Sequence, residues 1–134
     1  PEEYLTKSEE AARFVQATGI DALAVAVGTA HGEYKGKPKI YHERLAQIAS
    51  LVPLPLVLHG GSGIPDEDVI KAIGAGIAKI NVNTQISSAA VKSLREIMGR
   101  QKPGALADVM KEVEDVMTSE VTGFIRLFLR NKTM

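Results

Sequence analysis

Two histidines stand where buried strands are expected to end, and both could bind a metal. His31 closely follows the apolar run of residues 23–28, and His59 lies within the run of residues 56–60. Imidazole is a ligand that suits zinc when cysteine is absent, and a catalytic zinc commonly takes three protein ligands and keeps one position open. Two histidines are one ligand short of that set. From position alone, hydrogen-bonded histidines at the rim of a sheet, or a proton shuttle, are the alternatives.

The third histidine, His42, is expected to have a different role. It opens a predicted helix beside Glu43 and Arg44. Charged neighbours of this kind are typical of a helix surface in contact with water. We therefore predict a solvated His42 that takes no part in a site.

A glycine-rich segment follows His59 directly. Residues 60–63 read Gly-Gly-Ser-Gly and precede a Pro-Asp pair that is typical of a helix start. Glycines let backbone N–H groups approach an anion, Ser62 offers a hydroxyl, and the N-terminus of the following helix adds a positive dipole. The segment is suited to a phosphate group, although a tight turn without a ligand would show the same glycines.

The third motif closes the last apolar run. Asn81 and Asn83 share strand parity with Lys79, so the three side chains are expected on one side of the strand, where packing alone would favour apolar residues. Thr84 follows at the start of a helix. A helix cap is as good an interpretation of Thr84 as a ligand contact.

Three strands and the helices between them must position these residues. The apolar runs, residues 23–28, 56–60 and 78–83, are rich in small and β-branched side chains and are typical of strands buried on both faces. Helical spacing covers residues 8–18, 41–51, 66–75, 85–98 and 106–128, and Gly19 is placed to end the first of these helices. This alternation predicts right-handed crossovers and a parallel sheet, as a barrel or a doubly wound fold. In such folds the loops after the strands converge at one edge, and a barrel phosphate is frequently held after its last two strands.

The composition restricts the partners. Sixteen basic and sixteen acidic residues among 134 cancel, which argues against a nucleic-acid or anionic-membrane partner. The absence of cysteine excludes disulfides and thiolate metal sites and fits a reducing compartment, so we expect a cytoplasmic location. No apolar run approaches the roughly 20 residues that span a bilayer. Pro1 is interpreted as a cut end, because the first four residues lack both an initiator Met and the pattern of a signal peptide.

Together, residues 28–32 (Gly-Thr-Ala-His-Gly), 58–63 (Leu-His-Gly-Gly-Ser-Gly) and 81–84 (Asn-Val-Asn-Thr) resemble the class II fructose-bisphosphate and tagatose-bisphosphate aldolases. The match covers about residues 4–98. It implies an α/β fold, the C-terminal part of a (β/α)₈ TIM barrel with about the last three strands, their helices and a C-terminal helix. Residues 1–134 would then form the C-terminal half of one barrel domain, with the N-terminal half absent from this chain.

The resemblance also implies a site. His31 and His59 correspond to two of the three zinc-binding histidines of the family. The positions that match its contacts to dihydroxyacetone phosphate are Gly32, Gly60, Gly61, Ser62, Asn81, Val82, Asn83 and Thr84. The third histidine, a proton-transferring aspartate and a glutamate on a mobile loop belong to the first half of such a chain, so no catalytic residue is assigned here. A monovalent cation near the phosphate and a homodimer or homotetramer are further expectations.

The implied reaction is zinc-dependent, reversible cleavage of fructose 1,6-bisphosphate to dihydroxyacetone phosphate and glyceraldehyde 3-phosphate. A tagatose-bisphosphate enzyme is an alternative, because the two sugars share the half that these motifs would contact. A Schiff-base mechanism on Lys79 is a rival; we expect Lys79 instead to be ion-paired or snorkelled. A non-catalytic phosphate-binding half-barrel is a further alternative. The tail, residues 124–132, departs from the family pattern, and its apolar face is expected to pack on the barrel or on a neighbouring subunit.

Overall fold

The chain folds as helices that alternate with three short strands, followed by two long helices. The computed structural model describes residues 4–29, 38–102 and 104–130. Its elements are α1 (Ser8–Thr18), β1 (Leu23–Ala24), α2 (His42–Leu51), β2 (Leu56–Leu58), α3 (Asp66–Gly74), β3 (Ile77–Ile80), α4 (Thr84–Met98) and α5 (Leu106–Leu129).

The three strands form a parallel sheet in the order β1-β2-β3. Leu23 pairs with Leu56, and Leu56 pairs with Ile77. The alternation of strand and helix predicted this parallel arrangement, and the prediction is confirmed. The strands are shorter than the apolar runs, so His59 and Asn81 each follow the last residue of a strand.

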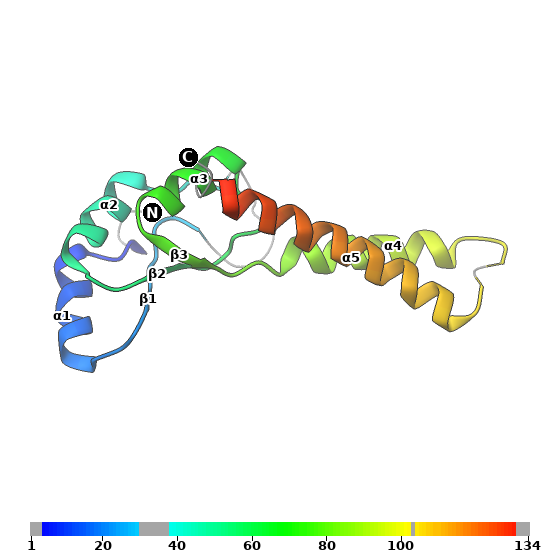
Figure 1. Ribbon diagram of the computed structural model, residues 1–134, viewed down its shortest axis with the longest axis horizontal. Coiled ribbons are helices and arrows are strands. Elements are labelled where there is room, and N and C mark those ends of the chain that lie inside the picture. Colours follow the sequence, from blue (N-terminus) through cyan, green and yellow to red (C-terminus); the bar gives the residue numbers. More distant parts are fainter. Residues whose placement is uncertain (1–3, 30–37, 103, 131–134) are drawn as a thin grey trace.

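One face of the sheet carries the core. Its members include Leu23, Leu56 and Ile77, which pack with the buried helix residues Leu45 and Val69. Figure 1 shows α1, α2 and α3 around the sheet, with the α4–α5 pair extending away from it. The core therefore lies between the strands, the first three helices and the C-terminal end of α5, which contributes Leu127.

The opposite face is only partly covered. Ala24 and Lys79 are exposed, whereas Val57 between them is buried. The prediction that all three strands are buried on both faces is wrong for β1 and β3. The physical reason is that, among the described residues, the helices pack on the core face and leave Ala24 and Lys79 on the other face open to solvent.

The signals for helix ends act as expected. Gly19 follows α1 in a left-handed conformation, with φ 62°, and its N–H donates to the carbonyl of Val15. Pro65 precedes α3, whose first turn carries acidic residues that suit a helix N-terminus. The long segment near the C-terminus forms a 24-residue helix, α5, as predicted.

Helix α5 is amphipathic but only partly packed. Val109, Val113 and Leu127 are buried against neighbouring elements. Met110 and Ile125 remain 53% and 52% exposed, so much of its apolar surface faces solvent. No helix within the described ranges is both long and apolar enough to cross a membrane.

Candidate phosphate and metal site

The loops that follow β2 and β3 are bonded to each other. Asn81 donates its N–H to the carbonyl of Leu58, and Gly61 donates its N–H to the carbonyl of Asn81, both at 2.9 Å. Gly60 has a φ of 69°, which glycine adopts readily. The glycine-rich loop is thereby held against the strand end that carries Asn81.

A pocket of about 490 Å³ opens between these two loops. Its lining consists of Gly60, Ser62, Ile80, Asn81, Val82, Asn83 and Thr84. Apart from Ile80, every lining residue belongs to the substrate-binding set predicted from the sequence. The structure thus brings two separate sequence motifs together around one hollow.

Two members of the predicted set are not in this lining. Gly61 is absent from the pocket lining, and its N–H donates to the carbonyl of Asn81. Gly32 lies outside the described residues. A direct contact of either glycine with substrate stays a prediction.

Ser62 connects the glycine-rich loop to α4. Its side chain is buried, and its Oγ accepts a hydrogen bond of 3.1 Å from the N–H of Gln85 in the first turn of α4. Ser62 therefore fills the capping role that the sequence suggested for Thr84, which is the first residue of the helix. Because the hydroxyl accepts this bond through a lone pair, its own proton can still be donated to an anion in the pocket.

His59 lies at the carboxyl end of β2 and is half-buried. The side-chain nitrogen of Asn81 is 3.1 Å from its Nδ1 and 3.2 Å from its Nε2. A point almost equally distant from both nitrogens cannot lie in the ring plane without overlapping Cε1, so the amide lies over the ring face. The amide therefore does not lie along the in-plane lone pair that a metal would use.

The imidazole of His59 fits the role of one ligand in a zinc site. His59 supplies an imidazole nitrogen beside the pocket, and nitrogen ligands suit zinc in a chain without cysteine. His31 falls outside the described residues, so its ligand role stays a prediction. Within the described ranges, no group of three or more His, Cys, Asp or Glu residues could hold a metal ion. The ring of His59 therefore needs further ligands to complete a site.

Lys79 lies on the same side of its strand as Asn81. Its side chain is exposed, and its Nζ donates to the Oδ1 of Asn81 at 2.5 Å. The expectation of a buried ion pair is wrong, because the side chain is exposed and its partner is a neutral amide. The residue instead bonds directly to a member of the pocket lining.

His42 also departs from its prediction. It is the first residue of α2, but its side chain is only 30% exposed and its Nε2 is 2.9 Å from the Oδ1 of Asp68. Its Nδ1 is buried and has no hydrogen-bond partner within the described residues. The solvated role is therefore wrong, because α3 packs beside the start of α2 and brings Asp68 to the ring.

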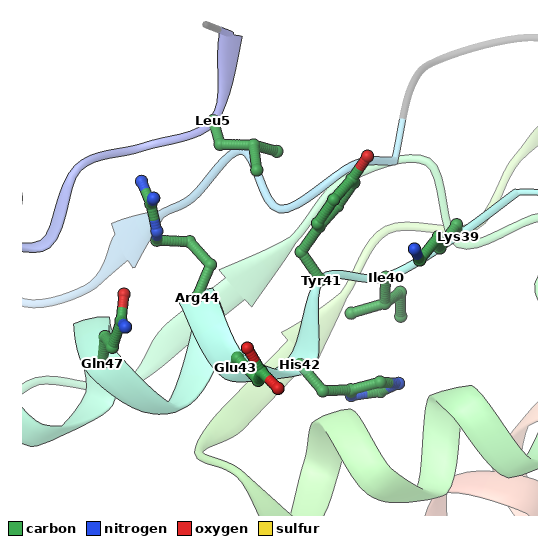
Figure 2. A pocket seen from close by; sticks show the side chains of 8 residues that line it. All are labelled: Leu5, Lys39, Ile40, Tyr41, His42, Glu43, Arg44 and Gln47. Carbon is green, nitrogen blue, oxygen red and sulfur yellow. The ribbon is translucent and has the colours of Figure 1, made fainter. Parts of the chain in front are cut away.

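A second hollow, of about 480 Å³, lies beside the start of α2. Figure 2 shows its lining: Leu5, Lys39, Ile40, Tyr41, His42, Glu43, Arg44 and Gln47. The ring of His42 turns toward α3 in this view, away from Tyr41. Sequence reasoning missed the pair between His42 and Asp68, although both belong to the first turns of consecutive helices, which are neighbours in a parallel fold.

Comparison with known sequences identifies a family. The family model described as "Fructose-bisphosphate aldolase class-II" matches residues 1–133. A fructose-bisphosphate aldolase of Staphylococcus epidermidis is 49% identical over 94 residues, which are 70% of this chain and 33% of that protein. The chain thus spans about a third of the length of this curated relative.

Solved structures agree in fold. The YdjI aldolase of Escherichia coli K12 superimposes with a TM-score of 0.84 at 38% identity, over 92% of this chain and 46% of that one. A fructose-bisphosphate aldolase of Campylobacter jejuni has a TM-score of 0.79 at 21% identity, over 94% of this chain and 46% of that one, and supports the fold alone. The three parallel strands and their helices therefore match part of an aldolase TIM barrel, and the chain belongs to the class II fructose-bisphosphate aldolase family.

Proposed function

We propose that this chain is the C-terminal half of a zinc-dependent ketose-bisphosphate aldolase that reversibly cleaves fructose 1,6-bisphosphate to dihydroxyacetone phosphate and glyceraldehyde 3-phosphate. One observation supports the proposal above all: Asn81 lines the polar pocket and also lies over the ring of His59. A phosphate in the pocket would therefore place the attached carbons beside the candidate metal ligand.

The pocket supplies the groups that bind and orient a sugar phosphate. Ser62 can donate its hydroxyl proton, and the N-terminus of α4 directs its dipole toward the space beside Thr84. Fixing the phosphate in this way holds the reacting carbons in one place, which is a large part of catalysis in reactions of this kind. The pocket residues would thus orient the substrate.

His59 and His31 would hold the zinc ion together with a ligand from outside this chain. When bound, zinc supplies Lewis-acid stabilisation of the negative charge that develops on the substrate oxygens as the C3–C4 bond breaks. The amide of Asn81 would donate to a substrate oxygen from its position beside His59. Proton transfer falls to residues of the remaining part of the barrel.

The uncovered face of the sheet is where the remaining strands would pack. Ala24 and Lys79 are exposed on that face, and a barrel would enclose them. The exposed apolar residues of α5, including Met110 and Ile125, support an assembly of two or more subunits. Both features fit a chain that works as part of a larger unit.

A chimaeric enzyme tests the proposal. The segment of the Staphylococcus epidermidis enzyme that matches this chain over 94 residues is replaced by the corresponding residues of this chain. Cleavage of fructose and tagatose 1,6-bisphosphate is then followed through the triose phosphate released. We expect cleavage of the fructose substrate, loss of activity with a chelator, recovery with zinc, and a lower bound-zinc content in His59→Ala.

Three outcomes would overturn parts of the proposal. Activity that survives the chelator but is lost on borohydride treatment with substrate would indicate a Schiff-base enzyme. Faster cleavage of tagatose bisphosphate would change the substrate. A folded chimaera that binds dihydroxyacetone phosphate without cleaving either sugar would favour the non-catalytic phosphate-binding module. If the chimaera fails to fold, a phosphate titration of the 134-residue chain, followed through the amide signals of Ser62 and Thr84, tests the pocket alone.

A further inference from the structure

The contact between Lys79 and Asn81 fixes which way the asparagine amide faces. A lysine ammonium group can only donate hydrogen bonds, so the atom of Asn81 that it meets at 2.5 Å must be the oxygen. The NH₂ group then necessarily points the other way, toward the ring of His59. The amide orientation, which is usually ambiguous, is thus determined by its neighbour.

An irregularity in β3 brings Lys79 to this position. Leu56 pairs with Ile77, but Val57 pairs with Lys79, so Ala78 is an extra residue in the strand. A bulge of this kind redirects the side chains that follow it. Ile77 consequently points into the core, while Lys79, two residues later, lies on the opposite face with Val57.

The same bulge aligns the residues of the site. Without it, Val57 would pair with Ala78, and Lys79 would lie on the core face with Ile77. With it, Lys79 and Asn81 occupy the face onto which His59 also projects, as their contacts show. Lys79 itself is not part of the pocket lining, whereas Asn81 is.

We propose that Lys79 is a positioning residue that acts through Asn81. By holding the amide oxygen, Lys79 presents the NH₂ group of Asn81 to the ring of His59 and to an anionic oxygen of a sugar phosphate in the pocket. With the amide reversed, its oxygen would face that same anion and repel it. This inference rests on the proposed aldolase function for its effect on rate, but the effect of Lys79 on Asn81 and His59 does not depend on it.

Kinetics of variants in the chimaeric aldolase test the role of Lys79. Lys79→Met keeps the length of the side chain but removes the donor, and we expect kcat to fall about 10- to 100-fold with a smaller change in KM, since misplacing one group by about 1 Å can cost about 100-fold. Lys79→Arg should recover most of the rate, which a Schiff-base lysine would not allow. Lys92→Met removes an exposed lysine of α4 and should leave the kinetics unchanged.

A double-mutant cycle separates positioning from a direct role. If Lys79 acts through Asn81, Lys79→Met should cause no further loss in an Asn81→Ala background. Full additivity of the two losses, or no loss in Lys79→Met alone, would overturn the proposal.

A readout without catalysis keeps the inference distinct from the proposed function. The ring nitrogen signals of His59 are followed by NMR in ¹⁵N-histidine-labelled, metal-free protein and are assigned with His59→Gln. Lys79→Met should shift these signals. In an Asn81→Ala background, Lys79→Met should cause no such shift. If the wild-type chimaera cleaves no sugar but the signals respond in this way, the proposed function fails and the role of Lys79 stands. Unchanged signals in a folded Lys79→Met protein would refute the role of Lys79 itself.

Discussion

The N–H of Gly61 donates to the carbonyl oxygen of Asn81 at 2.9 Å, so a backbone hydrogen bond joins the loop after β2 to the end of β3. Gly61 stands between Gly60 and Ser62, which both line the pocket, and Asn81 lines it as well. The position of the pocket wall therefore depends on how closely two segments of backbone approach each other. Close approach of this kind is a reason for glycine at position 61.

Gly61→Ala should damage both the fold and the pocket. A Cβ atom at this position would lie 2.5 Å from the Cγ2 of Ile80 and 3.0 Å from the carbonyl oxygen of Asn81. The carbonyl belongs to the backbone, so it cannot move aside without displacing the end of β3. We expect the free energy of unfolding to fall by about 1–3 kcal/mol, as for other overpacked sites. Denaturant unfolding measures this loss, and a phosphate titration should show weaker binding. Unchanged stability and binding would show that the two loops can separate without cost.

Gly123→Ala is the matched glycine change with the opposite expected sign. Gly123 lies within α5, and a Cβ atom there would meet nothing within 4 Å. Alanine in a helix interior is more favourable than glycine by about 0.5–1 kcal/mol. We expect a higher melting temperature with unchanged phosphate binding. A lower melting temperature would mean that the exposed side of α5 is covered in the intact protein.

Ser62→Ala should remove a helix cap and a phosphate donor together. The Oγ of Ser62, which is 8% exposed, accepts from the N–H of Gln85, so alanine would leave that N–H without its capping partner. Loss of a capping hydroxyl costs about 1 kcal/mol. We expect a destabilisation of this size by denaturant unfolding and weaker phosphate binding, whereas Ser88→Ala, at an exposed position of α4, should change neither. Full phosphate affinity in Ser62→Ala would exclude the hydroxyl as a ligand group.

The pair of His42 and Asp68 should couple α2 to α3. The two side chains meet at 2.9 Å and each is 30% exposed, so the expected coupling is about 1 kcal/mol, the size of an ordinary hydrogen bond. A double-mutant cycle of His42→Ala and Asp68→Ala, followed by denaturant unfolding, measures this energy. Glu43→Ala, at the exposed position beside His42, serves as the control. A coupling energy near zero would make the contact incidental.

Much of this molecule follows from local sequence signals. Gly19 ends α1 and Pro65 precedes α3 as predicted, because these residues act through backbone conformations that do not depend on the rest of the fold. The parallel order of the strands follows from their alternation with helices. The meeting of Ser62 and Asn81 at one hollow was predicted as well, since both lie just beyond the ends of neighbouring strands, and such ends converge in parallel sheets. Their contact with substrate stays a prediction.

What could not be predicted depends on contacts between elements. The proposed role of Lys79 depends on the extra residue in β3, which turns its side chain away from the core. The amino-acid sequence around Ala78 gives no sign of this bulge. The burial of His42 requires α3 to lie beside α2, so its local sequence, with Glu43 next to it, indicated a solvated residue. The exposure of Ala24 and Lys79 on one face of the sheet could not be predicted without knowing which elements pack on which face. In each case the deciding neighbour is distant in sequence.

The ion pair between Arg100 and Glu112 should make the stability of the α4–α5 pair depend on acid pH. Both guanidinium nitrogens of Arg100 donate to the carboxylate at 2.8 Å, and these hydrogen bonds, with the arginine charge, hold the pKa of Glu112 below its ordinary value of 4.5. A carboxyl group whose pKa is lower in the folded state contributes stability above the unfolded pKa and loses it as pH falls through the folded pKa. Glu112→Gln should therefore lower the melting temperature at pH 7, and its difference from the wild type should shrink as the pH falls below about 4.5. Glu96→Gln serves as the control: its partner Lys92 is 3.9 Å away, so its melting temperature should differ less from the wild type at every pH. If the difference for Glu112→Gln stays constant between pH 7 and pH 3, Arg100 and Glu112 are not paired in solution.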